Sequence, residues 1–158
     1  MNSLLRNKHV LWSGIIILLL LMTFCILVFY KAEKKSLKCL SMIHKALPEQ
    51  AVYLSSVLTL SESSKGSFFF KGTLVGKKTG KLNLERQVTF EYSSPGDSRL
   101  ILAHFNTSRG TADNVPDEVF NRSVFDTASQ STELYLTKLN NVFLLNNIFM
   151  PVQVCVPE

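Results

Sequence analysis

An uncharged apolar run from Val10 to Tyr30, VLWSGIIILLLLMTFCILVFY, constrains this chain more than any other feature of its sequence. As a helix this run would be about 31 Å long, because a helix rises about 1.5 Å per residue, and that length matches the hydrocarbon core of a bilayer. Trp12 and Tyr30 lie near its two ends, where amphipathic rings prefer the lipid headgroups. The sequence therefore predicts a transmembrane helix over residues 10–30, preceded by a cytoplasmic tail over residues 1–9.

A cleaved signal peptide is the alternative interpretation of this run. The apolar part of a signal peptide is roughly 7–15 residues long and ends in small residues at the cleavage site. Here the run is longer, and bulky residues stand where small ones are needed. Phe24 directly before Cys25 also argues against lipid attachment at that cysteine. We therefore expect a retained signal anchor.

The net charge of +5 does not call for a nucleic-acid partner. Cationic residues beside an apolar run are attracted to anionic lipid headgroups, and no basic helix interleaved with aromatic residues follows. A count of positive charges alone would place the C-terminal side in the cytoplasm, so the charges leave the orientation open. The flanking basic residues are Arg6, Lys8, Lys31, Lys34, Lys35 and Lys38.

Two cysteines outside the apolar run, Cys39 and Cys155, lie near the two ends of the remaining chain. A disulfide that joins the start of a domain to its end is typical of oxidising compartments, and closing such a long loop stabilises by up to about 4.7 kcal/mol. Two unrelated buried thiols are the alternative. The disulfide interpretation places the β-rich domain over residues 39–158 outside the cytoplasm, in the periplasm. The charged residues 31–38 before it are expected to form a juxtamembrane collar.

Short segments with strand-like patterns, separated by turn residues, fill this domain. The clearest one, from Leu82 to Tyr92, alternates apolar and polar residues strictly, which is typical of a half-buried antiparallel strand. Because the connections are short, consecutive strands are expected to be neighbours in a β-meander. The expected strands cover residues 37–44, 52–60, 67–75, 82–92, 99–105, 133–139 and 142–145, with a last segment over residues 149–156.

The segment ADNVPDEVF predicts one short helix from about Pro116 to Phe125. Asp113 or Asn114 can cap it, and proline fits its first turn. The expected fold class is therefore α+β, mostly β: a single N-terminal transmembrane helix, followed by a small antiparallel β-meander or curved sheet with one short helix.

The sequence shows no constellation of catalytic or metal-binding residues. His9, His44 and His104 are far apart and lack the spacing of metal ligands, and no nucleophile elbow is present. His104 falls on the same predicted face as Leu100 and Leu102, where a core or edge histidine with a hydrogen-bond partner is expected. We therefore expect no enzyme, no cofactor and no metal.

Arg86 and Phe69 are the candidate contact residues. Arg86 interrupts the apolar face of the clearest strand. It either pairs with a carboxylate inside the fold or contacts an anionic ligand or partner. Phe69 is the middle residue of three consecutive phenylalanines, and alternation in a strand turns it away from the other two. It is a candidate partner or lipid contact unless the predicted helix covers it.

These features together resemble a known family. The GTLVG…LNLERQVTFEYS hairpin, the ADNVPDEVF segment and the C-terminal PVQVCV, behind a basic tail and one anchor, resemble the FidL-like inner-membrane proteins of enterobacteria. The architecture is also similar to ToxS and PsaF, which act from the periplasm on membrane-spanning transcriptional regulators of the ToxR/CadC type. The resemblance implies a single-pass bacterial inner-membrane protein whose periplasmic domain binds and stabilises such a regulator. It implies no catalytic residues.

A periplasmic sensor domain that binds a small ligand or a lipid is the alternative function. A hydrolase is a third hypothesis, but it would need a nucleophile and a base that the sequence does not show. The first two hypotheses predict different structures. A cavity lined by the apolar strand faces would favour the ligand-binding sensor, whereas a filled core with an exposed sheet edge or apolar patch would favour the partner-binding protein.

Overall fold

The computed structural model describes residues 16–24, 36–77, 79–96, 98–147 and 150–157. The chain divides into two units, Met1–Lys35 and Ser36–Glu158. In the first unit, residues 16–24 are helical. Within the described ranges, no helix has both the length and the apolar character needed to cross a bilayer. The other parts of the predicted span, residues 10–15 and 25–30, lie outside the described residues, as do the tail and collar residues 31–35.

The described part of the second unit contains eight strands and one short helix. Each segment for which the sequence predicts a strand lies within one of these strands, and several strands are longer than expected. The helix α2 spans Asp117–Ser123. The strands are β1 Leu37–Ala46, β2 Gln50–Leu60, β3 Lys65–Gly76, β4 Gly80–Ser93, β5 Arg99–Arg109, β6 Ser131–Leu139, β7 Val142–Asn147 and β8 Met150–Pro157.

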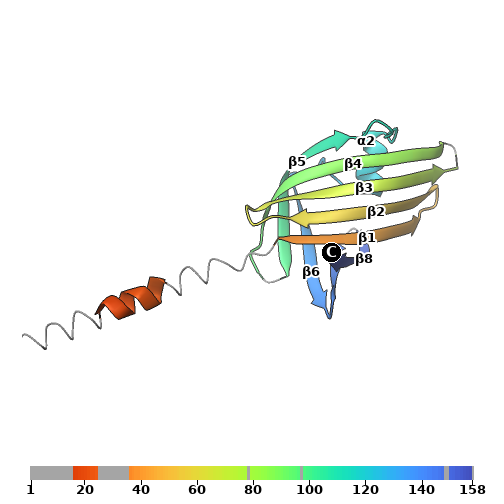
Figure 1. Ribbon diagram of the computed structural model, residues 1–158. Helices are drawn as coiled ribbons and strands as arrows, with labels where there is room; N and C mark the ends of the chain where they lie inside the picture. Colours follow the sequence, from red (N-terminus) through yellow and green to blue (C-terminus); the bar gives the residue numbers. More distant parts are fainter. Residues whose placement is uncertain (1–15, 25–35, 78, 97, 148–149, 158) are drawn as a thin grey trace, which may run out of the picture. The chain divides into compact units, whose positions relative to one another are not determined.

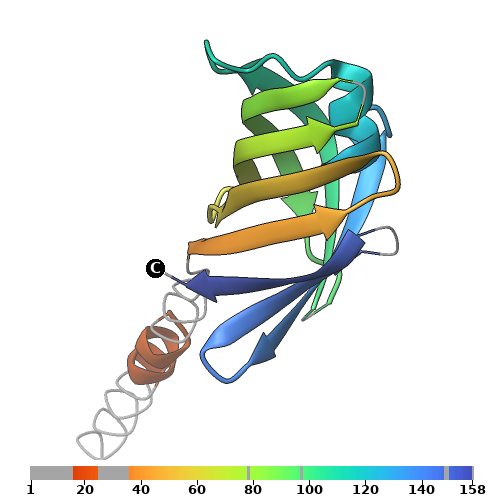
Figure 2. The ribbon, with the colours of Figure 1, turned by 90° about the vertical axis from the view of Figure 1, so that its right-hand side faces the viewer.

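The strands form a closed antiparallel barrel in chain order (Figure 1). Consecutive strands pair throughout, and β8 returns to β1 with Cys39 opposite Pro157 and Leu40 opposite Val156 (Figure 2). The predicted fold class is therefore wrong, because the sheet closes on itself and no described helix spans a membrane.

The sequence pattern of β1 does not indicate that this strand closes the barrel. Cys39 and Ser41 face the interior and are buried, whereas Met42 on the opposite face is 82% exposed. The inner face of β1 therefore mixes apolar Leu37 and Ile43, which pack against the core, with the small Cys39 and Ser41, and the outer face carries the apolar Leu40 and Met42. The apolar residues of β1 are thus divided between its two faces, whereas those of a regular half-buried strand all face the core.

A disulfide joins Cys39 to Cys155 beside the junction of β1 and β8. The two Cα atoms are 5.4 Å apart across a sequence separation of 116 residues, and both side chains are fully buried. This is the pairing expected from the sequence, and the separation lies within the range that a disulfide requires. The bond therefore connects the first strand of the barrel to the last.

The interior of the barrel is filled by aromatic and aliphatic side chains. Helix α2 lies at the end of the barrel where β1 and β3 end (Figures 1 and 2). Phe120 of α2 packs against Phe70 of β3, and Phe125, just after the helix, packs against Phe68 and Phe70. Six rings contact one another with centroid separations of 5.3 to 6.5 Å: Phe68, Phe70, Phe90, Phe105, Phe120 and Phe125.

A β-bulge between β4 and β5 moves His104 out of the interior. Thr89 pairs with Asn106 but Glu91 pairs with Ala103, and His104 has a φ of 56°. One extra residue in β5 breaks the alternation. Phe105 therefore follows Leu102 on the inner side, and His104 is exposed with Nδ1 2.9 Å from Glu91 Oε2. The prediction that His104 shares a face with Leu100 and Leu102 is wrong.

Candidate functional site

Apolar side chains form a row across the outside of four neighbouring strands. Leu40 of β1 lies opposite Val156 of β8 and Val57 of β2, and Val57 lies opposite Phe69 of β3. Met42 and Val154 extend this row, because residues two apart in a strand share a face. We call this set the outer apolar face: Leu40, Met42, Val57, Phe69, Val154 and Val156.

The outer apolar face is substantially open to solvent. Met42 is 82% exposed, Val156 51%, Val154 49% and Phe69 37%, and Leu40 and Val57 are half-buried. Lys38 and Lys71 lie beside it on the same outer side of β1 and β3, and Lys71 Nζ is 3.6 Å from a carboxylate oxygen of Glu85. A contiguous apolar patch with a charged rim is typical of an interaction surface.

Phe69 points outward because strand alternation places its two neighbours inside. Phe68 and Phe70 are 3% and 2% exposed, and both contact Phe125 in the core. Helix α2 thus packs on the inner side of β3 and leaves Phe69 uncovered. This geometry makes Phe69 available for contact, and its role as a contact residue stays a prediction.

Arg86 is buried in a cluster of charges. Its side chain is 1% exposed and lies between β4 and the segment that leads into α2. Nε donates to Asp113 Oδ2 at 3.0 Å, Nη2 donates to Asp113 Oδ1 at 3.0 Å and to Val115 O at 2.7 Å, and Nη1 donates to Asp117 Oδ1 at 2.9 Å. The guanidinium carbon lies 4.4 Å from the centroid of the Phe120 ring.

This cluster satisfies both hydrogen-bonding edges of the Arg86 guanidinium. The Asp113 carboxylate, itself fully buried, also accepts hydrogen bonds from the backbone N–H groups of Val115 and Glu85. At the solvent edge, a hydrogen bond from Arg109 lowers the pKa of Asp117, and the charge of Arg86 acts in the same direction. The geometry therefore agrees with the structural interpretation of Arg86 and leaves it no exposed surface for a partner.

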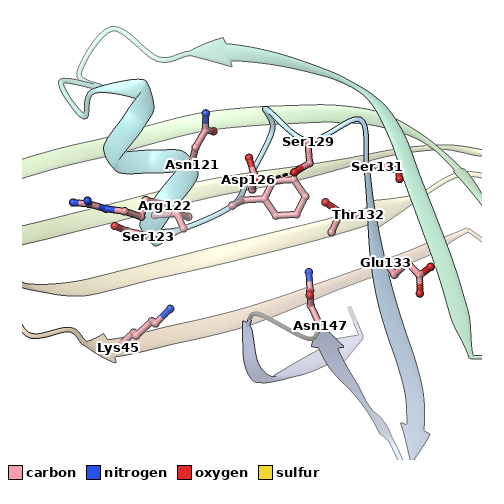
Figure 3. A pocket seen from close by; sticks show the side chains of 12 residues that line it. Lys45, Asn121, Arg122, Ser123, Asp126, Ser129, Ser131, Thr132, Glu133 and Asn147 are labelled. Atoms are coloured by element: carbon pink, nitrogen blue, oxygen red, sulfur yellow. Dashed lines mark hydrogen bonds between the residues drawn. The ribbon is translucent and has the colours of Figure 1, made fainter.

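A cavity of about 550 Å³ lies between the C-terminal half of α2, the start of β6, and the ends of β1 and β7 (Figure 3). Most of its lining residues have polar side chains, and Val124 and Phe125 are the two apolar ones. The lining residues are Lys45, Asn121, Arg122, Ser123, Val124, Phe125, Asp126, Ser129, Ser131, Thr132, Glu133 and Asn147.

A family model described as FidL-like putative membrane protein matches residues 72–155 of the chain. The chain belongs to the FidL-like family. No curated protein and no solved structure matches it. The matched range begins within β3 and ends within β8, so it contains Arg86, Asp113 and the α2 side of the cavity.

Sequence reasoning missed the partners of Arg86 in this FidL-like protein. Asp113 and Asn114 are predicted as helix caps, but neither caps α2, whose N-cap position is Pro116 without a side-chain hydrogen bond. Asp113 binds Arg86 instead, and Asn114 Oδ1 accepts a hydrogen bond from the backbone N–H of Asn83. The available signal is an arginine on an apolar strand face with acidic residues close to one another downstream.

The FidL-like barrel brings no metal-binding set together in the residues that the structure describes. His44 stacks on Tyr53 with ring centroids 4.3 Å apart, and His104 contacts Glu91 on another part of the outer surface. His9 lies outside the described residues. The cavity beside α2 is the second feature that sequence reasoning missed, because three separate segments contribute to it: the end of β1, residues 121–133 and the end of β7.

Proposed function

We propose that this FidL-like protein is a bacterial inner-membrane accessory protein, anchored through residues 10–30, whose periplasmic barrel binds and stabilises a partner. The proposed partner is a membrane-spanning transcriptional regulator of the ToxR/CadC type. The observation that carries this proposal is the outer apolar face, which lies outside a barrel whose core is already filled.

The filled core supports partner binding over ligand binding inside the barrel. The strand faces that could line an internal ligand cavity are covered by packed rings from β3, β4, β5 and the α2 region. Exposed apolar side chains gain free energy when a partner removes them from water, at about 25 cal/mol per Å² of apolar area. Confining both proteins to one membrane raises their effective concentration, so a modest interface is sufficient.

The disulfide supports a periplasmic location, because such bonds form and persist in oxidising compartments. An alkaline phosphatase fusion after Glu158 is expected to be active, and a green fluorescent protein fusion at the same point is expected to be dark. The same two reporters fused before Met1 serve as the control and should give the opposite pattern. A dark phosphatase and a bright fluorescent protein after Glu158 would contradict the proposed orientation.

Replacing Met42 and Phe69 together with serine is expected to weaken binding of the regulator at least about tenfold, because large apolar side chains at an interface centre carry much of its binding energy. Binding is measured by co-purification of the two full-length proteins from membranes with graded amounts of the regulator. The melting temperature should change little, since both side chains point away from the core.

Tyr135→Ser is the matched control for the Phe69 substitution. Tyr135 is 37% exposed, like Phe69, but lies on β6, outside the outer apolar face. Its replacement should leave regulator binding unchanged. Equal losses in the Tyr135 variant and the Met42/Phe69 variant, or no loss in either, would contradict the assignment of this face as the binding surface.

The second candidate function, a periplasmic sensor of a small ligand, is supported by the cavity beside α2. This cavity lies at the end of the barrel and is lined mainly by polar residues, rather than by the apolar strand faces. A sensor role is therefore compatible with partner binding, because the two would use different surfaces of the barrel.

A further inference from the structure

We propose that the cavity beside α2 binds a small hydroxylated organic anion, with Lys45 as the main counter-charge. This site deepens the second candidate function and is independent of the outer apolar face. Its volume of about 550 Å³ lies within the range of about 300–1,000 Å³ that is typical of small-molecule sites.

Lys45 occupies an unusual position for a cation. It lies on the inner side of β1, in the same alternation as Cys39 and Ser41, whereas Met42 and His44 are on the outer side. At the end of β1 the lysine side chain points into the cavity, and Asn147 from β7 also lines it (Figure 3). The inner face of the barrel thus changes from apolar to polar where the cavity begins.

The two cations of the cavity lining have no ion-pair partner among the described residues, although two carboxylates, Asp126 and Glu133, also line the cavity. Lys45 and Arg122 make no ion pair with the carboxylates of the described residues. In Figure 3 both lie toward the α2 and β1 side of the cavity, whereas Glu133 lies on β6, on the opposite side. An anion in a recess that is partly shielded from water would interact with Lys45 more strongly than it does in bulk solvent.

The two carboxylates of the lining already have donors of their own. Asp126 accepts hydrogen bonds from Ser129 Oγ at 2.5 Å and from the backbone N–H of Ala128 at 2.9 Å. The hydrogen bond from Ser129 is the main cause of the lowered pKa of Asp126. Glu133 accepts a hydrogen bond from Arg99 Nε at 3.2 Å. Glu133 is therefore paired with a cation from outside the cavity lining, whereas Asp126 keeps its negative charge, because its two donors are neutral. The anionic group of a ligand must then lie on the Lys45 side of the cavity, away from Asp126.

The remaining lining indicates a ligand with hydroxyl groups. Ser131 and Thr132 contribute hydroxyls, and Asn147 contributes an amide. The amide oxygen of Asn121 already accepts hydrogen bonds from Thr127, so Asn121 offers only its NH2 group. Such groups can both donate and accept hydrogen bonds. Val124 and Phe125 are 8% and 2% exposed and form a small apolar wall. A sugar acid and a sugar phosphate both have this chemistry, namely one anionic group on a small hydroxylated body.

The test uses the full-length protein in detergent micelles and three probes: glucuronate, glucose 6-phosphate and uncharged glucose. Binding is followed through the backbone amide chemical shifts of residues 121–133 and 147. At least one of the two anions is expected to give saturable shifts confined to these residues, and glucose is expected to bind at least about tenfold more weakly. Saturation by glucuronate alone would identify a carboxylate ligand, and saturation by glucose 6-phosphate alone a phosphate ligand.

Lys45→Gln is expected to weaken binding of that anion about tenfold, since it removes the charge but keeps a polar side chain of similar reach. Lys81→Gln on β4 removes a charge from an exposed position outside the cavity and should leave binding unchanged. If Lys45→Gln does not fold, Arg122→Gln at an exposed position takes its place, with a smaller loss expected.

Three results would overturn the proposal. The first is the absence of saturable shifts with either anion up to about 10 mM, a concentration that detects even weak binding. The second is binding of glucose as tight as that of the anions. The third is unchanged anion binding in a folded Lys45→Gln variant. None of these results bears on regulator binding by the outer apolar face, which does not include the cavity residues.

Discussion

Replacing Arg86 with alanine is expected to lower the free energy of unfolding by about 3–5 kcal/mol, because it leaves a buried carboxylate without its counter-charge. Asp113 is fully buried and receives two hydrogen bonds from the Arg86 guanidinium. The guanidinium also packs on the Phe120 ring, so the substitution removes contacts as well as charge. Urea unfolding of the full-length protein, followed by circular dichroism, measures the loss, and the melting temperature should fall by about 10 °C or more.

Arg99→Ala is the matched control, since it also removes an arginine from an ion pair. Arg99 and Glu133 are 44% and 37% exposed, and exposed pairs contribute about 0–1 kcal/mol. A double variant, Arg86→Met with Asp113→Asn, should recover part of the lost stability, because it removes the unpaired charge and keeps an acceptor for the backbone N–H of Val115. An Arg86→Ala variant as stable as Arg99→Ala would contradict this account.

The same variant separates a structural role of Arg86 from a binding role. Because Arg86 is 1% exposed, any loss of regulator binding in Arg86→Ala should follow the loss of folded protein. Regulator binding measured well below the melting temperature of the variant should therefore be close to that of the wild type. Abolished binding by a fully folded Arg86→Ala protein would show a contact role instead.

Removing the disulfide is expected to lower the free energy of unfolding by about 2–5 kcal/mol, the usual loss for a small extracytoplasmic domain. The bond closes a loop of 116 residues and joins β1 to β8. Its loss therefore weakens the closure of the barrel and also raises the conformational entropy of the unfolded chain. Cys39→Ser, Cys155→Ser and the double variant should unfold at similar urea concentrations, because each abolishes the same bond.

Peptide mapping without reduction checks the pairing directly, since it should yield a linked peptide pair that contains Cys39 and Cys155. Reduction of the wild-type protein should shift its unfolding midpoint toward that of the double variant and leave the double variant unchanged. An unfolding midpoint that reduction does not move in the wild-type protein would contradict a stabilising role for the bond.

The side-chain alternation of the strands could be predicted from the sequence because it is a local property of extended backbone. Leu84, Val88 and Phe90 lie inside as their spacing predicts, and Phe69 lies outside between two buried rings. The same reasoning failed at His104, because the expected alternation assumes a regular ladder. A single extra residue opposite β4 reverses the faces, and no glycine marks the position.

The cluster at Arg86 could be predicted only in part. An arginine between Leu84 and Val88 calls for a carboxylate, and the sequence offers acidic residues at Asp113 and Asp117. These residues also suit a helix start, so their type alone does not decide between the two roles. The choice depends on how the segment before α2 folds back along β4, where Asn114 N and Gly110 N donate to carbonyls of that strand.

By itself, the sequence determined the order of the strands and, up to the bulge in β5, their faces. It also determined the resemblance to the FidL-like family and the cysteine pair. These features depend on neighbouring residues or on residue type. Only the tertiary structure decided that the sheet closes and that the hydrogen bonds of Arg86 are satisfied within the fold. It also decided that Lys45 lines a cavity together with residues of α2, β6 and β7. Each of these features brings together segments far apart in the chain. Their geometry depends on how strand twist and register accumulate around the whole barrel, which no local pattern records.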